Sequence, residues 1–233
     1  MQLYINEAED FGLAFNTMTR MMCRDRDREL LELTKRTLTE YVPYFSPRTL
    51  VCAIRDLRPE GDPWNPEIPE DQKEEYEEIL KLLVKQYLTL ENQKPYSDFQ
   101  KLNNLRNIAS ECYLVPGAYD RAWFSSVDDF VQWVEENQLQ EPAEYIKDCY
   151  DKPIPIRQEC LKDFGKVCFW MIKYSIGRLS YMPYAAMTFV KTNIKLLDQE
   201  IMQNMKNCLE ANGGNDEVWI ALMAALNAEM QNR

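Results

Sequence analysis

Closely spaced carboxylates are the residues whose types and spacing are best suited to chemistry. Three pairs of glutamates are each separated by three positions: Glu74 and Glu77, Glu75 and Glu78, and Glu141 and Glu144. Residues three apart lie on one face of a helix. Paired carboxylates on such a face can hold Mg²⁺, which prefers oxygen ligands, and can support metal-assisted hydrolysis. The same pairs also occur in any acidic helix, where they have no catalytic role.

A second group gathers arginine, tyrosine and methionine around a break between two expected helices. It lies in the stretch 174–184, where Gly177 and Pro183 interrupt the helical pattern. Arginine and tyrosine are enriched at the energetic centres of protein interfaces, and methionine adapts its shape to varied partners. We therefore predict a partner-binding site at Arg178, Tyr181, Met182 and Tyr184. The alternative is a structural helix corner, in which Arg178 binds the carbonyls of a helix end or a carboxylate.

The net charge of −11 is concentrated in two acidic blocks of the chain. Residues 59–78 contain nine acids and one base, and residues 111–150 contain nine acids and two bases. An acidic face can be attracted to a basic surface of another protein, such as a nucleic-acid-binding groove. We predict that this face includes Glu74, Glu75, Glu77, Glu78, Asp128 and Asp129. Alternatively, the acids only keep the protein in solution and favour helix N-termini.

Composition excludes several classes of protein. The sequence has no histidine, which rules out a Ser-His-Asp triad, a Cys-His dyad and any histidine-bound metal or haem. None of the seven glycines has the spacing of a dinucleotide-binding or P-loop motif. The acidic pI near 4.7 and the lack of a basic run disfavour direct binding of nucleic acid. No cofactor and no catalytic residue is predicted.

Cysteine usage and hydropathy favour a cytoplasmic protein. The seven cysteines are odd in number, have no C-x-x-C spacing and lie mostly in apolar runs, which is typical of free buried thiols. No secretory signal is recognised at the acidic N-terminal end. The longest uncharged stretch, 179–190, is too short to cross a membrane and contains Pro183. We therefore expect neither a disulfide framework nor a membrane-spanning segment.

Hydrophobic spacing predicts an all-α protein with about eight to ten helices and little or no sheet. We expect one helical domain over 1–233, with a possible sub-boundary in the proline-rich loop 59–69 and a C-terminal helical core at 156–233. Leu3–Ile5 is either a short strand or a docked arm, and the prolines make 152–155 extended. The expected helices span 7–22, 25–42, 47–57, 70–90, 98–112, 127–134, 142–150, 156–176, 183–210 and 217–226.

Several residues mark the ends and the interior of these helices. Ser46, Ser97 and Ser126 are predicted N-caps, because a serine hydroxyl can accept hydrogen bonds from the first free amides of a helix. Gly177 fits the position after a helix C-terminus. Apolar residues of the first helix recur at helical spacing and are expected in the core: Phe11, Phe15, Met18 and Met22.

The C-terminal third also resembles a family of small accessory proteins encoded by phages and mobile elements. The resemblance rests on Trp170, Tyr174, the string Ile176-Gly177-Arg178-x-Ser180-Tyr181, and Trp219 with Leu222. In that family a Trp precedes a Tyr-Ala-Leu-Gly-Arg-x-Thr/Ser-Tyr corner, whereas this chain has Ser175 in place of the Ala. The likeness covers about 160–226. It implies a setting in which such proteins bind and disable host machinery, and no particular reaction.

These patterns together favour a non-enzymatic protein that acts by binding. The expected partner is a protein with a basic surface, in a nucleic-acid-handling host or defence complex that the chain would inhibit. One alternative is a magnesium-dependent enzyme of the all-α nucleotide pyrophosphohydrolase type, which uses E-x-x-E helices. Another is a structural subunit whose apolar C-terminal helices form the contact of a homo-oligomer.

Overall fold

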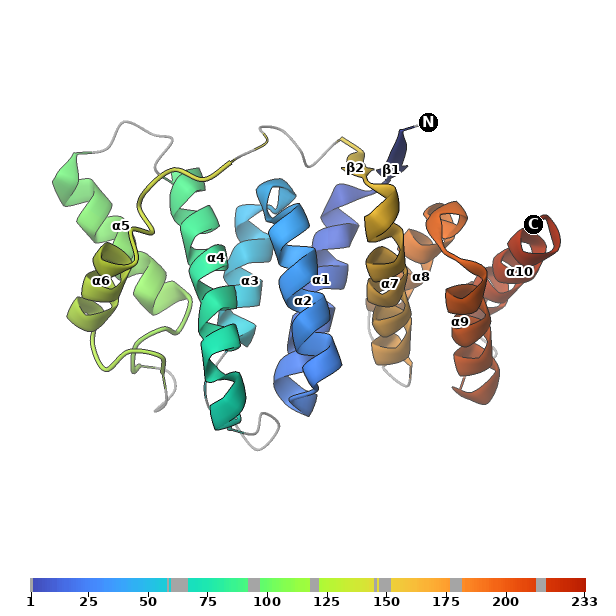
Figure 1. Ribbon diagram of the computed structural model, residues 1–233, viewed down its shortest axis with the longest axis horizontal. Coiled ribbons are helices and arrows are strands. Elements are labelled where there is room, and N and C mark those ends of the chain that lie inside the picture. The colour runs from blue at the N-terminus through green and yellow to red at the C-terminus, as the bar shows by residue number, and fades with distance from the viewer. Residues whose placement is uncertain are drawn as a thin grey trace. The chain divides into compact units, whose positions relative to one another are not determined.

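The fold was analysed in a computed structural model, which describes residues 2–57, 59, 67–91, 97–117, 122–144, 146, 152–176, 182–212 and 217–233. Within these ranges the chain forms ten α-helices and one two-stranded sheet, which confirms the all-α prediction (Figure 1). Contacts divide it into two compact units. Unit 1 consists of Met1–Met18 and Asp148–Arg233, and unit 2 consists of Thr19–Lys147. Helix α1 (Ala8–Asp25) begins in unit 1 and ends in unit 2.

Unit 2 contains the five helices that follow α1. Short polar side chains cap four of them: Asp27, Ser46, Ser97 and Ser126 each accept a hydrogen bond from the amide three residues later. The three serine caps predicted from the sequence are therefore confirmed. The helices are α2 (Arg28–Tyr41), α3 (Pro47–Asp56), α4 (Lys73–Glu91), α5 (Asp98–Glu111) and α6 (Val127–Glu136).

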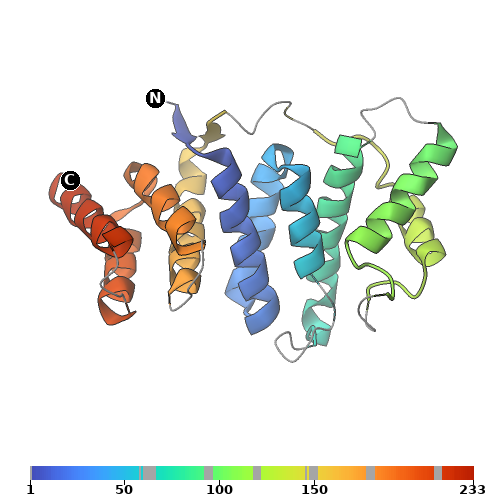
Figure 2. The same ribbon diagram turned by 180° about the vertical axis from the view of Figure 1, so that it is seen from behind.

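The core of unit 2 is centred on α4, which packs against both α2 and α3. Figure 1 shows α2 and α4 side by side, and Figure 2 shows α3 on their other side. Tyr76 of α4 is fully buried, and its hydroxyl donates a hydrogen bond to the Met22 carbonyl oxygen at 3.1 Å. Burial raises the pKa of Tyr76 to about 12. The hydroxyl therefore stays protonated and can keep this buried contact.

Unit 1 joins the N-terminal segment to the C-terminal helices. Strand β1 (Leu3–Ile5) pairs antiparallel with β2 (Ile154–Ile156), so that Ile5 lies opposite Ile154. Phe11, Phe164 and Phe189 are fully buried, with ring centroids 6.0–6.3 Å apart. The C-terminal helices are α7 (Leu161–Ser175), α8 (Met182–Thr192), α9 (Gln199–Asn212) and α10 (Glu217–Gln231). Helices α7 and α9 lie nearer the viewer in Figure 1, and α8 and α10 lie nearer the viewer in Figure 2, which is seen from behind.

The single helix expected over 183–210 is wrong, because α8 ends at Thr192 and α9 begins at Gln199. The cause lies at Asn193, which is 1% exposed. Its amide nitrogen donates to the carbonyl oxygens of Phe189 and Asn6, each at 3.0 Å, and its amide oxygen accepts from the Asn6 backbone N–H at 2.8 Å. Asp198 then starts α9 by accepting from the Ile201 N–H at 2.7 Å. The long-range hydrogen bonds of Asn193 and the local cap formed by Asp198 thus interrupt a continuous apolar pattern.

Of the helix expected near 142–150, residues 142–144 and 146 are not helical, and the other residues lie outside the described part of the chain. Pro142 accounts for this, because proline restricts the residue before it and has no N–H to donate. The expected core positions Phe11, Phe15, Met18 and Met22 are all fully buried. In the ranges described, no helix is both long enough and apolar enough to cross a membrane. Most of the proline-rich loop 59–69, at 60–66, lies outside the described residues.

Candidate protein-binding surface

Helix α6 is the element of unit 2 that presents most unbalanced charge. Its start is fixed by Ser126, whose hydroxyl accepts from the Asp129 N–H at 3.1 Å. Phe130 and Val134, four residues apart, are fully buried on one face. The opposite face therefore carries Asp128, Gln132, Glu135 and Glu136, because a seven- or eight-residue separation returns to the same side of a helix. All four of these residues are exposed.

Two aromatic rings of α6 form a cluster with one ring from the segment before the helix. The Phe124 ring lies 5.3 Å from Phe130 and 5.0 Å from Trp133, and Phe130 lies 6.1 Å from Trp133, measured between centroids. Aromatic pairs at these separations stabilise beyond the apolar area that they bury. Since Phe130 and Trp133 belong to α6 itself, these ring contacts join the helix to the segment that precedes it.

Four hydrogen bonds attach the segment around α6 to other parts of unit 2. Two come from indole nitrogens, and two come from backbone amides. The bonds are Trp123 Nε1 to the Leu57 carbonyl at 2.6 Å, Trp133 Nε1 to Glu77 Oε1 at 3.1 Å, Phe124 N to the Leu114 carbonyl at 3.0 Å, and Ala143 N to Thr89 Oγ1 at 3.0 Å. They anchor the segment before, within and after the helix. A preorganised surface loses less conformational entropy when a partner binds.

The α6 acidic surface is defined here by six carboxylates that are exposed to solvent. No lysine or arginine occurs between 122 and 144, and none of the six carboxylates forms an ion pair within the described part of the chain. Among the described residues, no cation therefore balances their charges. The six residues are Asp128, Asp129, Glu135, Glu136, Glu141 and Glu144.

Two of these carboxylates occupy positions that do not favour the helix itself. Glu135 and Glu136 lie in the last turn of α6, which has no basic residue. The C-terminal end of a helix carries partial negative charge, so anions there destabilise it by about 0.3–1 kcal/mol each when exposed. Asp128 and Asp129 lie at the favourable N-terminal end. Helix stability alone thus accounts for the two aspartates and leaves the two glutamates unexplained.

The glutamates of α4 differ, because three of the four have cationic partners. Glu75 pairs with Arg28 at 3.5 Å, Glu77 with Lys81 at 2.9 Å, and Glu78 with Lys35. The hydrogen bonds from Lys81 and Trp133 lower the pKa of Glu77, and the bond to Glu78 raises the pKa of Lys35. Glu74 is exposed. Much of the charge of this predicted site is therefore compensated inside the protein.

The pairs proposed for magnesium do not share one arrangement. Glu77 and Glu78 are engaged by Lys81 and Lys35, and Glu141 and Glu144 lie on irregular backbone instead of a helix. Among the described residues, no group of three or more cysteine, aspartate and glutamate side chains is placed to hold a metal ion.

The second predicted site falls largely outside the described residues. Arg178 and Tyr181 are not described, and Met182 is described only as the first residue of α8. Tyr184 is described and is 50% exposed on α8. It belongs to unit 1, whereas the α6 acidic surface belongs to unit 2.

The site predicted from the sequence includes only two of the six carboxylates of the α6 acidic surface, Asp128 and Asp129. It omitted Glu135, Glu136, Glu141 and Glu144, although the charge count of their block included them. One feature of the sequence could have identified these four residues. No basic residue occurs over 122–144, whereas basic residues do occur within and near α4.

Comparisons with protein-family models, with curated proteins and with solved structures gave no match for this chain.

Proposed function

We propose that this protein is a non-enzymatic binding protein, which uses the α6 acidic surface to dock on a basic surface of another protein. The observation that carries the proposal is the set of six exposed carboxylates over 122–144, with no basic residue among them and no ion pair in the described chain. Charges of one sign on an anchored helix produce a local field that attracts a complementary surface.

The placement of Glu135 and Glu136 supports binding over simple solvation of a helix. These residues oppose the helix dipole in the last turn of α6, so they are retained at a cost to local stability. Residues that break a local stability rule are often found where a protein functions. The four hydrogen bonds to other parts of unit 2 keep these charges in place, which favours recognition over non-specific attraction.

The proposal extends to the kind of partner. Basic surfaces of the required size are common in proteins that hold nucleic acid, because phosphate contacts need lysine and arginine. An acidic surface docked there would exclude the nucleic acid and so inhibit the partner. The resemblance of 160–226 to phage and mobile-element accessory proteins suggests a host or defence complex as the target.

A variant with reversed charges on α6 tests the proposal. Glu135→Lys with Glu136→Lys changes the net charge by four and places cations at the helix end that favours them. The variant should therefore fold at least as well as the wild type. We expect proteins captured from a host lysate by the wild type to be lost by this variant. Capture should fall steeply with salt, since the Debye length is about 8 Å at 0.15 M.

A matched control separates the surface from total charge. Glu32→Lys with Glu210→Lys makes the same change at exposed positions of α2 and α9, and should retain capture. Added double-stranded DNA should release proteins that depend on α6. Equal capture by the wild type and the α6 variant, with both shown to be folded by circular dichroism, would contradict the proposal.

A further inference from the structure

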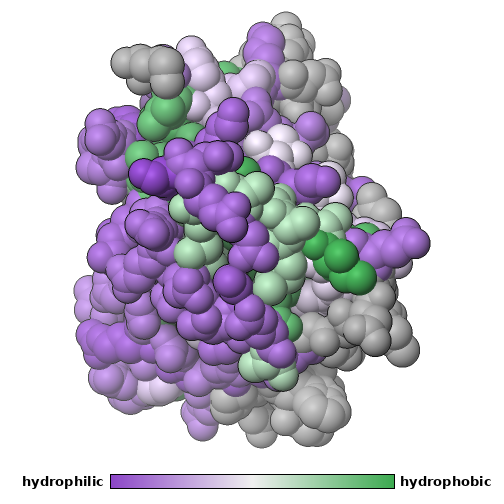
Figure 3. Space-filling view, turned by 90° about the vertical axis from the view of Figure 1, so that its right-hand side faces the viewer, coloured by the Kyte–Doolittle hydropathy of each residue, from purple (hydrophilic) through white to green (hydrophobic). Residues whose placement is uncertain are grey.

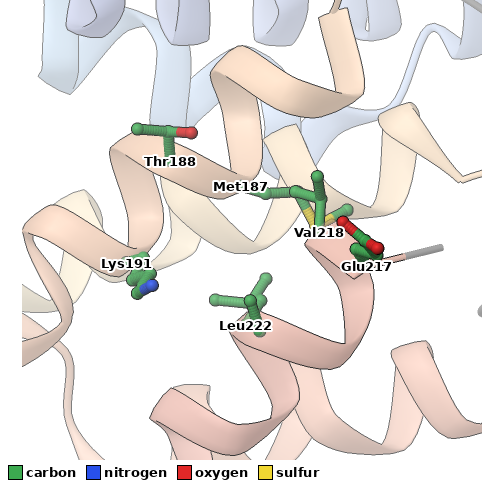
Figure 4. A pocket seen from close by; sticks show the side chains of 7 residues that line it. Met187, Thr188, Lys191, Glu217, Val218 and Leu222 are labelled. Atoms are coloured by element: carbon green, nitrogen blue, oxygen red, sulfur yellow. The ribbon is translucent and has the colours of Figure 1, made fainter.

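A pocket between α8 and α10 of unit 1 lies apart from the α6 acidic surface. Its volume is about 340 Å³. Met187 and Leu222 are buried at its base, and Val218 and Ala221 are partly exposed. Figure 4 shows Lys191 of α8 and Glu217 of α10 at opposite ends of it. The pocket is therefore an apolar hollow with one positive and one negative end.

Two large apolar side chains are exposed on the helices that line this pocket. Ile220 of α10 is 58% exposed and Tyr184 of α8 is 50% exposed, and both lie on the two helices that line it. Tyr184, Thr188 and Lys191 share one face of α8, since they are four and three residues apart. Figure 3 views the side on which α9 and α10 lie in Figure 1, and shows hydrophobic residues gathered there within a hydrophilic surface.

The face formed by α8 and α10 has few charged residues, which is unusual for so acidic a chain. Helix α10 has no charged residue from Val218 to Ala228, and the region 156–233 holds nine basic and eight acidic residues. A second copy of the chain can approach such a face without strong repulsion. The α6 acidic surface, in contrast, would repel its counterpart on another copy.

We propose that the face formed by α8 and α10 binds the same face of a second copy, as a two-fold symmetric dimer. In such a contact each residue pair occurs twice, with the roles exchanged. Lys191 of one copy then lies opposite Glu217 of the partner copy, and Glu217 opposite the partner copy's Lys191. Neither residue forms an ion pair within the described part of the chain. Both are thus available, and Ile220 is covered on each copy.

Sedimentation velocity of the full chain over a concentration series tests this dimer. We expect a species of twice the 27.6 kDa chain mass, with the monomer appearing on dilution. Ile220→Glu places a charge in the contact without touching the core, and should weaken dimerisation about tenfold or more. A monomer at every concentration, or an Ile220→Glu variant that dimerises like the wild type, overturns the proposal.

A charge swap tests the paired geometry directly. Lys191→Glu alone and Glu217→Lys alone each bring like charges together, and each should weaken dimerisation about tenfold. The double variant restores opposite charges and should recover most of the affinity. Lys162→Glu, at an exposed position of α7, is the control with the same charge change and should have no effect. Thermal melting of every variant confirms folding. A double variant that is no better than the single variants contradicts the pairing.

Discussion

Trp133 of α6 donates its indole N–H to Glu77 of α4, with Nε1 3.1 Å from Oε1. The same carboxylate oxygen lies 2.9 Å from Nζ of Lys81. Glu77 therefore binds both a neutral hydrogen-bond donor of another helix and a cation of its own helix. This contact joins two residues 56 positions apart and sets the position of the acidic helix on α4.

Removal of the indole donor should loosen α6. Trp133→Phe keeps an aromatic ring but loses the hydrogen bond, and should lower the free energy of unfolding by about 1 kcal/mol. The loss stays this small because water can bind the partly exposed Glu77 carboxylate once the indole N–H is gone. Urea denaturation measures the change. Trp219→Phe, at a partly exposed position of α10, makes the same side-chain change as a control. Equal losses from the two variants would mean that the bond to Glu77 has no stabilising effect.

The Glu77 contact should also depend on pH. Hydrogen bonds from Lys81 and then Trp133 hold the pKa of Glu77 below its ordinary value of 4.5. The ionised form stabilises the fold fully above pH 4.5, and this contribution is lost as the pH falls through the lowered pKa. The stability difference between the wild type and Glu77→Gln should therefore shrink on acidification. Urea unfolding over a pH series measures it, and a difference that grows at low pH would contradict this assignment.

Asn193 should hold the N-terminal segment of unit 1. Asn193→Ala removes its two hydrogen bonds to the Asn6 backbone, and should cost about 1–2 kcal/mol. Hydrogen exchange should become faster at the Asn6 amide. Asn193→Asp keeps an acceptor for that amide but loses both donors and buries a charge, so it should cost more. Unchanged protection of Asn6 in the alanine variant would show that the strand pairing alone holds this segment.

The fold could be predicted well wherever local signals and the apolar pattern agree. Ser97 caps α5 as expected because the capping interaction lies within four residues of sequence. The break at Asn193 could not be predicted, because its partner Asn6 lies 187 positions away. The apolar spacing continues from Val190 to Ile194 across that break. Periodicity reports which residues are buried, and it does not report whether the backbone between them stays helical.

Cysteine labelling should separate buried from accessible thiols. Burial raises the pKa of Cys112 to about 12, and it also raises the pKa of Cys168. Both thiols, with Cys23, are almost fully buried and should react with a disulfide reagent only on unfolding. Cys52 and Cys160 are partly exposed and should react first. Mass spectrometry of labelled peptides gives the order, and early labelling of Cys168 would contradict the packing of α7.

Magnesium should leave the melting temperature unchanged. Glu77 and Glu78 are already engaged by lysines, so Mg²⁺ would have to displace those contacts. A ligand that binds only the folded protein raises its stability by linkage. Differential scanning calorimetry with and without Mg²⁺ tests this expectation. A rise in melting temperature that is lost in the variant Glu74→Gln with Glu77→Gln would favour the hydrolase alternative.

The number of charges along the sequence locates the two acidic blocks, but it does not show in which block the carboxylates lack cationic partners. Glu78 and Glu136 look alike in sequence, since each follows another glutamate in a predicted helix. In the structure, Glu78 faces Lys35 of α2, whereas Glu136 has only a hydrogen bond from Gln132 of its own helix, at 2.7 Å. Which carboxylates are balanced depends on contacts between helices. Such contacts are set by tertiary packing and are not visible in local composition.

The division of the chain also sets an order of events during translation. Unit 2 is continuous, so all its residues are synthesised before the second segment of unit 1. Strand β1 is synthesised before unit 2, but its partner strand Ile154–Ile156, and Asn193, which bonds the adjacent Asn6, come after unit 2. The nascent chain must therefore carry an unpaired leading strand while unit 2 folds behind it. Residues that precede unit 2 in the chain therefore reach these native contacts only after unit 2 has been synthesised.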